Sequence, residues 1–213
     1  MSSDPEHHEV DEPAERPGAT DDKKFSEFLK TWITKLSDDE VTLREAYSSL
    51  MEIGNSQDEV PFIVRLTENP KFHLGGLGYF KGRVTLEQHD YVHILLGRGL
   101  TLIDEAFVIG FTMGTTDRVS TGERNLFGLI NKYLYPKPYR FTEEGMKVFN
   151  DAIALAYVSD CAALEAVDFK PLLDLPLHEV REAVGLEVDL LKAYYRIEAK
   201  RYPDSMPSQR LLD

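Results

Sequence analysis

The sequence predicts an all-α fold with a single multi-helix domain, and three observations support this. Apolar residues recur at helical spacing along most of the 213 residues. No segment sustains the alternation that is typical of a β-strand. Capping boxes, glycines and prolines mark where helices begin and end. We expect a disordered acidic tail over residues 1–22, an all-helical domain over residues 23–205 and a frayed C-terminus over residues 206–213.

The first half of the domain contains three predicted helices before its most informative segment. An amphipathic pattern over residues 22–36 predicts the first helix. The capping box at Ser37 to Glu40 predicts the start of a second, which continues to about Ile53. A third is expected over residues 59–67, followed by a loop over residues 69–82.

The second half of the domain is also expected to be helical. A capping box at Ser120 starts a helix that Pro136 ends. Thr142 can cap a long, mostly apolar helix that runs through Leu164. The last helix is expected to begin at Pro176 and to be interrupted by Gly185, with the chain fraying from about Tyr202.

The acidic composition limits the partners and the location of the protein. Residues 1–22 hold eight Asp or Glu and one Arg, and the whole chain has a net charge of −13. This balance excludes nucleic acid as a partner, because the phosphate backbone requires a basic surface. The start resembles neither a signal nor a transit peptide, and the longest charge-free apolar stretch, residues 106–116, is too short to span a bilayer. The sequence therefore indicates a cytoplasmic protein, at most peripheral to the membrane.

The segment HDYVHILLGRGLTLIDE, from His89 to Glu105, contains four candidate metal ligands. His89 and His93 are four residues apart, so they lie one turn apart on the same face of a helix. Asp90 is about 100° round from His89, within reach of the same ion. Apolar residues cover most of this helix, which indicates that it is buried on most sides.

Glu105 is expected to reach the histidines from a second helix. Gly97 and Gly99 break the first helix, and Thr101 can cap the next one. Asp104 then occupies the capping-box position, which places Glu105 in the first helical turn. A compact helix-turn-helix would bring Glu105 beside the two imidazoles.

Two imidazoles and two carboxylates favour Zn²⁺, while Mg²⁺, Mn²⁺, Co²⁺ and Fe²⁺ also fit this set of ligands. The alternative is a polar strip without a metal, since acidic residues stabilise the first turn of a helix by themselves. Solvated strips are rich in Lys and Glu, however, and not in His. A metal site at His89, Asp90, His93 and Glu105 is therefore the better interpretation.

The pattern H-D-x-x-H-x(11)-E resembles the hallmark of the ubiquinone (coenzyme Q) biosynthesis family conventionally numbered four. The segment LLDLPLHEVREAVGL, residues 172–186, is similar to the C-terminal segment of that family. The resemblance covers roughly residues 58–187, with departures at residues 85–88 and in the turn at residues 99–101. It implies an all-helical protein, peripheral to membranes, whose motif binds zinc or a related ion. It also implies a polyprenyl or other isoprenoid lipid and other quinone-biosynthesis proteins as partners; a homodimer stays open.

Three functions follow from the motif and the resemblance. The first is a metal-dependent carboxy-lyase that removes the C1 carboxylate of a prenylated benzenoid precursor, with Asp90 as a catalytic residue. Under this hypothesis Lys81 and Arg83, in a glycine-containing loop, orient the anionic head group. The favoured alternative is that the loop is only a structural turn. The second is a non-catalytic scaffold that binds an isoprenoid lipid. The third is a metal-dependent hydrolase with Asp90 as base.

Three further features are expected to be structural. Cys161, the single cysteine, excludes an internal disulfide and has neither His nor Lys beside it in the sequence, so it is expected to fill the core. His178 has no motif partner and is not expected to bind a metal. Gly110 and Gly114, four residues apart, would let another helix pack closely, or would line a site for an elongated apolar ligand.

Overall fold

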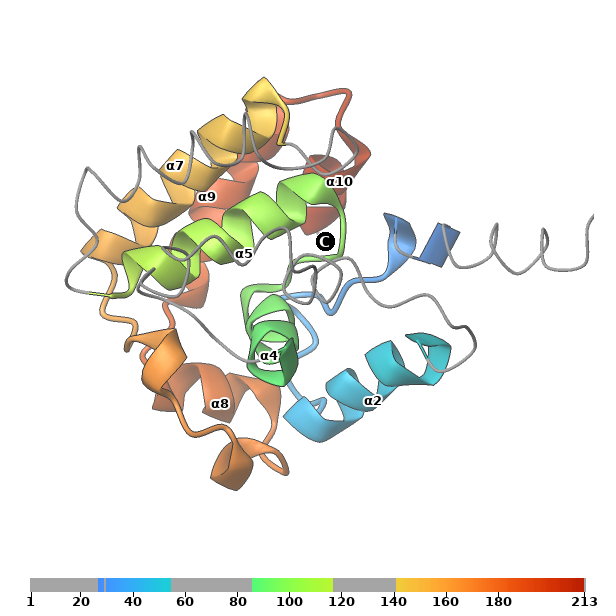
Figure 1. The fold of residues 1–213 in the computed structure, drawn as a ribbon, viewed down its shortest axis with the longest axis vertical. Helices are drawn as coiled ribbons and strands as arrows, with labels where there is room; N and C mark the ends of the chain where they lie inside the picture. Colours follow the sequence, from blue (N-terminus) through green and yellow to red (C-terminus); the bar gives the residue numbers. More distant parts are fainter. Residues whose placement is uncertain (1–26, 29, 55–85, 117–140, 213) are drawn as a thin grey trace, which may run out of the picture.

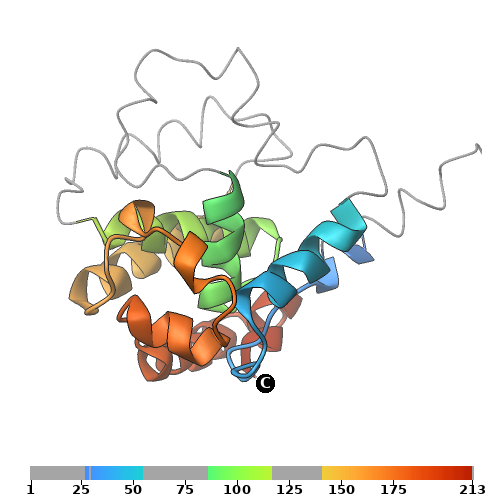
Figure 2. The ribbon, with the colours of Figure 1, turned by 90° about the horizontal axis from the view of Figure 1, so that it is seen from below.

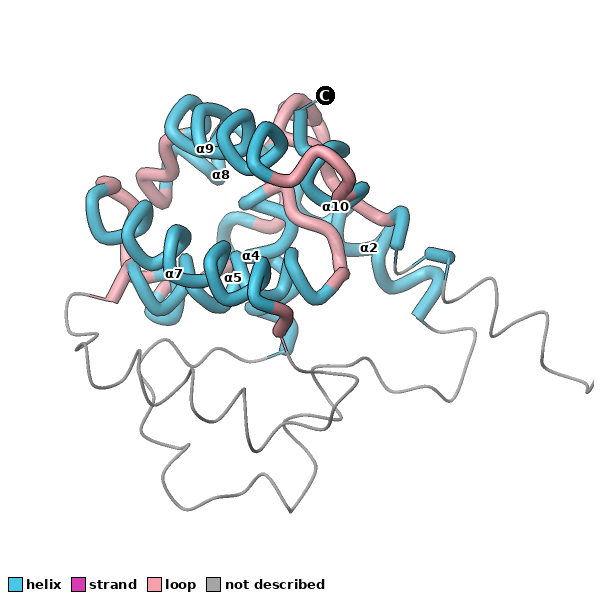
Figure 3. The backbone as a smooth tube through the Cα atoms, turned by 90° about the horizontal axis from the view of Figure 1, so that it is seen from above, coloured by secondary structure: helices cyan, strands magenta, loops and turns pink. Residues whose placement is uncertain are grey.

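A computed structural model describes residues 27–28, 30–54, 86–116 and 141–212. All regular secondary structure in these ranges is helical, which confirms the all-α prediction (Figure 3). The acidic tail, the helices predicted at residues 59–67 and 120–136, and the loop at residues 69–82 lie outside the described residues. The helices are α2 (Leu43–Gly54), α4 (Leu86–Leu96), α5 (Leu102–Gly114), α7 (Glu143–Val158), α8 (Leu177–Ala183), α9 (Val188–Arg201) and α10 (Met206–Gln209), with 3₁₀ turns η4 (Leu164–Ala166), η5 (Lys170–Leu172) and η6 (Arg210–Leu212).

Helix α4 lies at the centre of the molecule. It contacts α2, α5 and α8, and Figures 1 and 2 show it between them. Its residues Val92, Ile94, Leu95 and Leu96 are completely buried, as expected for a helix that is apolar on most sides. The two histidines of α4 are therefore presented inside the protein.

Helices α5 and α7 pack closely and run in the same direction (Figure 1). Gly110 on α5 faces the carbonyl of Phe149, and Gly114 faces that of Ile153. A Cβ atom at either glycine would lie 2.5 Å from the carbonyl oxygen, closer than real contacts allow. The two glycines thus permit backbone approach between helices, so in this structure they serve the core.

Two predicted helix boundaries in the first half of the chain need correction. The first helix does not reach Leu36, because residues 32–35 have no regular secondary structure. The second begins at Leu43 and not at Ser37. The structure uses a capping box at Thr42, whose backbone N–H and hydroxyl donate to Glu45 at 3.0 and 2.8 Å. An isolated bridge joins Thr42 to Pro176 directly before this helix.

Helix α7 is capped by Thr142 as predicted, but it ends at Val158 and does not reach Leu164. The chain then turns to pair with another segment, where the amide of Ala162 donates to the carbonyl of Val184 at 2.8 Å. The predicted break at Gly185 is confirmed: it has a φ of +70° and separates α8 from α9.

The C-terminal segment is not frayed, contrary to the prediction for residues 206–213. Residues 206–212 are helical, and Ser208 and Leu211 are buried. The side-chain amide of Gln209 donates to the carbonyls of Ala199 and Tyr202, at 2.7 and 3.1 Å. These contacts with α9 fix a segment whose polar sequence alone does not predict order.

Among the helices of the described residues, none combines the length and the apolar character that a membrane-spanning helix needs.

Candidate metal centre

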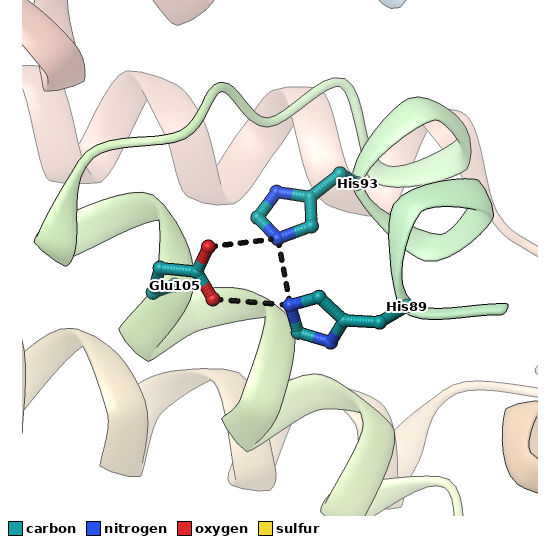
Figure 4. A group of neighbouring side chains, drawn as sticks. All are labelled: His89, His93 and Glu105. Carbon is teal, nitrogen blue, oxygen red and sulfur yellow. Dashed lines mark hydrogen bonds and ion pairs between the residues drawn. The ribbon is translucent and has the colours of Figure 1, made fainter. Parts of the chain in front are cut away.

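Helix α4 places His89 and His93 one turn apart on the face turned toward α5 (Figure 4). His93 is completely buried, and His89 is only 6% exposed. Because the rest of the helix is packed in the core, the two imidazoles have little freedom to turn toward solvent.

The turn between α4 and α5 brings Glu105 to this face. Gly97 adopts a φ of +63°, which ends α4 and reverses the chain. The predicted capping box is present: the amide of Thr101 donates to the carboxylate of Asp104 at 3.0 Å. Glu105 therefore lies in the first turn of α5, 5% exposed, as the sequence predicts.

The three side chains converge on one point. Nε2 of His89 lies 3.0 Å from Oε2 of Glu105, and Nε2 of His93 lies 3.3 Å from Oε1 (Figure 4). The two Nε2 atoms are 2.9 Å apart. Ligands at about 2.0–2.1 Å around a tetrahedral zinc ion are about 3.3–3.4 Å from one another. Shifts of a few tenths of an ångström would thus let this group hold an ion, and among the described residues it is the group with suitable geometry.

The hydrogen bond of the second ring nitrogen fixes the orientation of His93. Its Nδ1–H donates to the carbonyl of Gly99 at 2.7 Å. A neutral imidazole that carries its proton on Nδ1 has a lone pair on Nε2, the atom that faces His89 and Glu105. Metal-binding histidines are commonly held in this way by a backbone carbonyl.

With Glu105 ionised, protons on the imidazoles alone cannot satisfy this triangle. It has three short edges, between the two Nε2 atoms and between each of them and the Glu105 carboxylate, yet each Nε2 can carry only one proton. With both protons present the two N–H groups oppose each other, and with one proton an edge joins two lone pairs. A cation at the centre would satisfy all three edges at once. The arrangement therefore has the chemistry of a cation site.

Without an ion, the electrostatics of the group are those of a buried ion pair. Burial opposes ionisation of Glu105, but the charges of His93 and His89 outweigh it and hold the pKa of Glu105 well below its usual range. Burial likewise opposes protonation of His93, and the charge of Glu105 outweighs it, so the pKa of His93 is raised. Glu105 and His93 thus each stabilise the charged form of the other, which burial alone disfavours.

Asp90 lies outside the group of three. The structure brings His89, His93 and Glu105 within 4.8 Å of one another and does not include the Asp90 carboxylate. Asp90 is half-buried at the edge of the site, and burial raises its pKa to about 6, even though the two histidines lower it. Its predicted roles as ligand and catalytic residue stay predictions. Lys81 and Arg83 lie outside the described residues.

Cys161 lies in the core as expected, and His178 lies apart from the group of three. Cys161 is buried, and desolvation raises the pKa of its thiol to about 12, as for a core residue. His178 lies on the surface against the carbonyl of Asp39, and is not part of the metal group.

Sequence reasoning missed the residues that support the ligands. The carbonyl of Gly99 receives His93, and Arg98 and Arg210 approach the carboxylate of Asp104. Gly99 was interpreted only as a helix breaker. The sequence offers one signal for this support: Arg98 lies in an otherwise apolar stretch, and a buried arginine requires a buried carboxylate as its partner.

The chain matches no protein-family model, and no curated protein or solved structure matches it either.

Proposed function

We propose that the chain is a divalent-metal-dependent enzyme, with His89, His93 and Glu105 as the protein ligands and zinc as the favoured ion. The observation that carries the proposal is the triangle of ligand atoms, whose short edges protons cannot satisfy together. Two histidines and one carboxylate form a ligand set typical of catalytic zinc, which keeps a further position for water or substrate. A structural zinc site has four protein ligands, and the described residues supply three.

The reaction we propose is loss of the C1 carboxylate from a polyprenylated benzenoid, as the motif resemblance implies. The bond between the ring carbon and the carboxylate breaks, CO₂ leaves, and the electron pair on the ring carbon takes up a proton. A bound divalent ion would act as a Lewis acid toward a substrate oxygen and stabilise this developing negative charge.

Asp90 is our candidate for the residue that donates this proton. Asp90 directly follows His89 and is half-buried, so its carboxyl group could pass a proton to the ring carbon of a substrate bound at the ion. The capacity to deliver a proton at the edge of a cation site is what this reaction requires of the protein. The polyprenyl tail, and contact with other quinone-biosynthesis proteins, are proposed from the resemblance alone.

A second candidate, a non-catalytic isoprenoid-lipid scaffold with a structural ion, is favoured by one observation. His93 is fully buried and the other two ligands are at most 6% exposed. A site closed to this degree stabilises a fold well and needs no substrate.

Metal content and carboxylate release distinguish these functions. Purified protein should contain about one divalent ion per chain by elemental analysis. His89→Ala and His93→Ala should lose it, while His178→Ala, a surface histidine outside the group, should keep it. Wild type incubated with a prenylated hydroxybenzoate labelled at the carboxyl carbon should release labelled CO₂, whereas Asp90→Asn should release less.

Each outcome bears on a different part of the proposal. Wild type that retains none of zinc, cobalt, manganese, iron and magnesium removes the metal centre. A metal-loaded protein that releases no CO₂ but co-purifies with a prenyl lipid, identified by mass spectrometry, supports the scaffold instead.

A further inference from the structure

A buried charge cluster lies behind the candidate metal centre, where the α4–α5 turn meets the C-terminus. Arg98, in the turn, is completely buried and donates two hydrogen bonds to Glu198 of α9, at 3.0 and 2.5 Å. The hydroxyl of Ser208 donates to the same carboxylate at 2.9 Å. The end of the chain is thereby attached to the turn that separates the metal-binding helices.

Arg210 extends this attachment to the first turn of α5. Its guanidinium donates to Oδ2 of Asp104 at 2.5 Å and to the carbonyl of Lys30. Oδ2 of Asp104 is also the atom that caps α5 at Thr101. Since Asp104 directly precedes Glu105, a guanidinium that holds Asp104 restrains the backbone carrying a metal ligand.

The same guanidinium packs against Gly99. A Cβ atom built on Gly99 would overlap it, so the arginine occupies the space that any larger residue would need. The carbonyl of Gly99 accepts the Nδ1–H hydrogen bond of His93. One side chain therefore contacts the residue that orients His93 and the residue next to Glu105.

We infer that Arg210 is a positioning residue for the metal centre, which holds His93 and Glu105 in their converged arrangement through Gly99 and Asp104. The inference rests on the proposed metal centre. It assigns a role to a C-terminal segment far from the motif in sequence and without a metal ligand of its own. Loss of groups that orient metal ligands typically weakens metal binding by about 10–100-fold.

The test compares three variants of the full chain. Arg210→Gln removes the charge and the planar fork. Arg210→Lys keeps the charge, but one ammonium cannot reach Asp104, Gly99 and the Lys30 carbonyl together. Arg201→Gln is the matched control, because Arg201 also pairs with an aspartate, Asp151, but on the surface of α9. Zinc affinity is measured by competition with a chromophoric chelator, ligand geometry by the visible absorption of bound Co²⁺, and folding by thermal unfolding without metal.

We expect Arg210→Gln to bind zinc about 10–100-fold more weakly and to show an altered cobalt spectrum, with Arg210→Lys between it and wild type. Arg201→Gln should match wild type in both measurements. Arg210→Gln that only unfolds at a lower temperature, with unchanged affinity and spectrum, overturns the inference. If Arg210→Gln does not fold, Arg210→Lys decides in the same way. Wild type that binds neither ion removes the proposed metal centre and the inference with it.

Discussion

Nε2 of His89 lies 2.9 Å from Nε2 of His93, while His93 already donates from Nδ1 to the carbonyl of Gly99. A neutral His93 thus directs a lone pair into a space that it shares with His89 and Glu105. A proton that the metal-free site takes up at His93 must be released when an ion binds. Opposite responses to pH follow from this relationship.

Without metal, the His93–Glu105 pair should stabilise the fold most between about pH 4.5 and 6.5, the ordinary pKa values of the two groups. The pKa of Glu105 is lowered by folding, so its contribution is present above 4.5 and is lost as the pH falls through the lower folded value. The pKa of His93 is raised, so its contribution is present below 6.5 and is lost as the pH rises through the higher folded value.

With zinc bound, the dependence of stability on pH reverses, because the ion binds neutral imidazoles. The loaded protein should gain stability as the pH rises, and should release zinc as the pH falls below about 6.5. Thermal unfolding from pH 4 to 8.5, with zinc and after chelation, measures both trends. His93→Gln should flatten the difference, and identical curves for loaded and chelated wild type would contradict the prediction.

Asp90→Asn should stabilise the metal-free protein above pH 6. Burial raises the folded pKa of Asp90 to about 6 from 3.8, so its contribution is present below 3.8 and is lost as the pH rises through about 6. Asparagine remains neutral and avoids this loss, which we expect to be about 1–2 kcal/mol at pH 7.5. Urea unfolding at pH 7.5 and pH 4 measures it.

The advantage of Asp90→Asn should disappear at pH 4 and should shrink on zinc loading, because a nearby cation favours the carboxylate. Metal content should stay close to that of wild type, because Asp90 is outside the group of three. A variant that loses both the advantage and the metal would instead identify Asp90 as a ligand.

The helical hairpin of the site was predictable because its signals are local. Two histidines four residues apart, a glycine stop and a capping box at Thr101 determine the arrangement within one short segment. The start of α2 was not predictable in the same way. Ser37 and Thr42 both begin capping boxes, and the bridge to Pro176, far along the chain, selects Thr42.

The support of the site depends on contacts that sequence spacing cannot show. Arg210 lies 106 residues from Asp104 and 180 from Lys30, whose groups it contacts. A polar C-terminal segment is typical of fraying ends, but the contacts of Ser208 with Glu198 and of Gln209 with α9 hold it in place. Asp90 was included among the ligands from helical geometry, which gives the face of a residue but not the reach of its side chain.

Gly110→Ala should destabilise the fold by about 1–3 kcal/mol. Its Cβ would lie 2.5 Å from the carbonyl oxygen of Phe149, so α5 and α7 would have to separate. Gly145→Ala is the control: its Cβ would meet Phe141 at 3.3 Å, in the first turn of α7, where alanine also favours the helix. Urea midpoints should show a clear loss for Gly110→Ala and little change for Gly145→Ala. Equal midpoints would mean that the helices yield without cost.

Glu198→Gln should be among the most damaging single substitutions in the described part of the chain. Arg98 and Glu198 are both fully buried; burial lowers the pKa of Arg98, but the charge of Glu198 outweighs this effect and the pKa is raised overall. Removing the charge of Glu198 leaves the buried guanidinium with the more distant carboxylate of Asp104, at 3.8 Å, which costs about 3–5 kcal/mol. Asp174→Asn breaks the pair with Arg44, which is well exposed, and should change the free energy of unfolding little. Denaturant unfolding of both variants tests the contrast; a Glu198→Gln protein as stable as Asp174→Asn would show that water reaches Arg98 and replaces the lost partner.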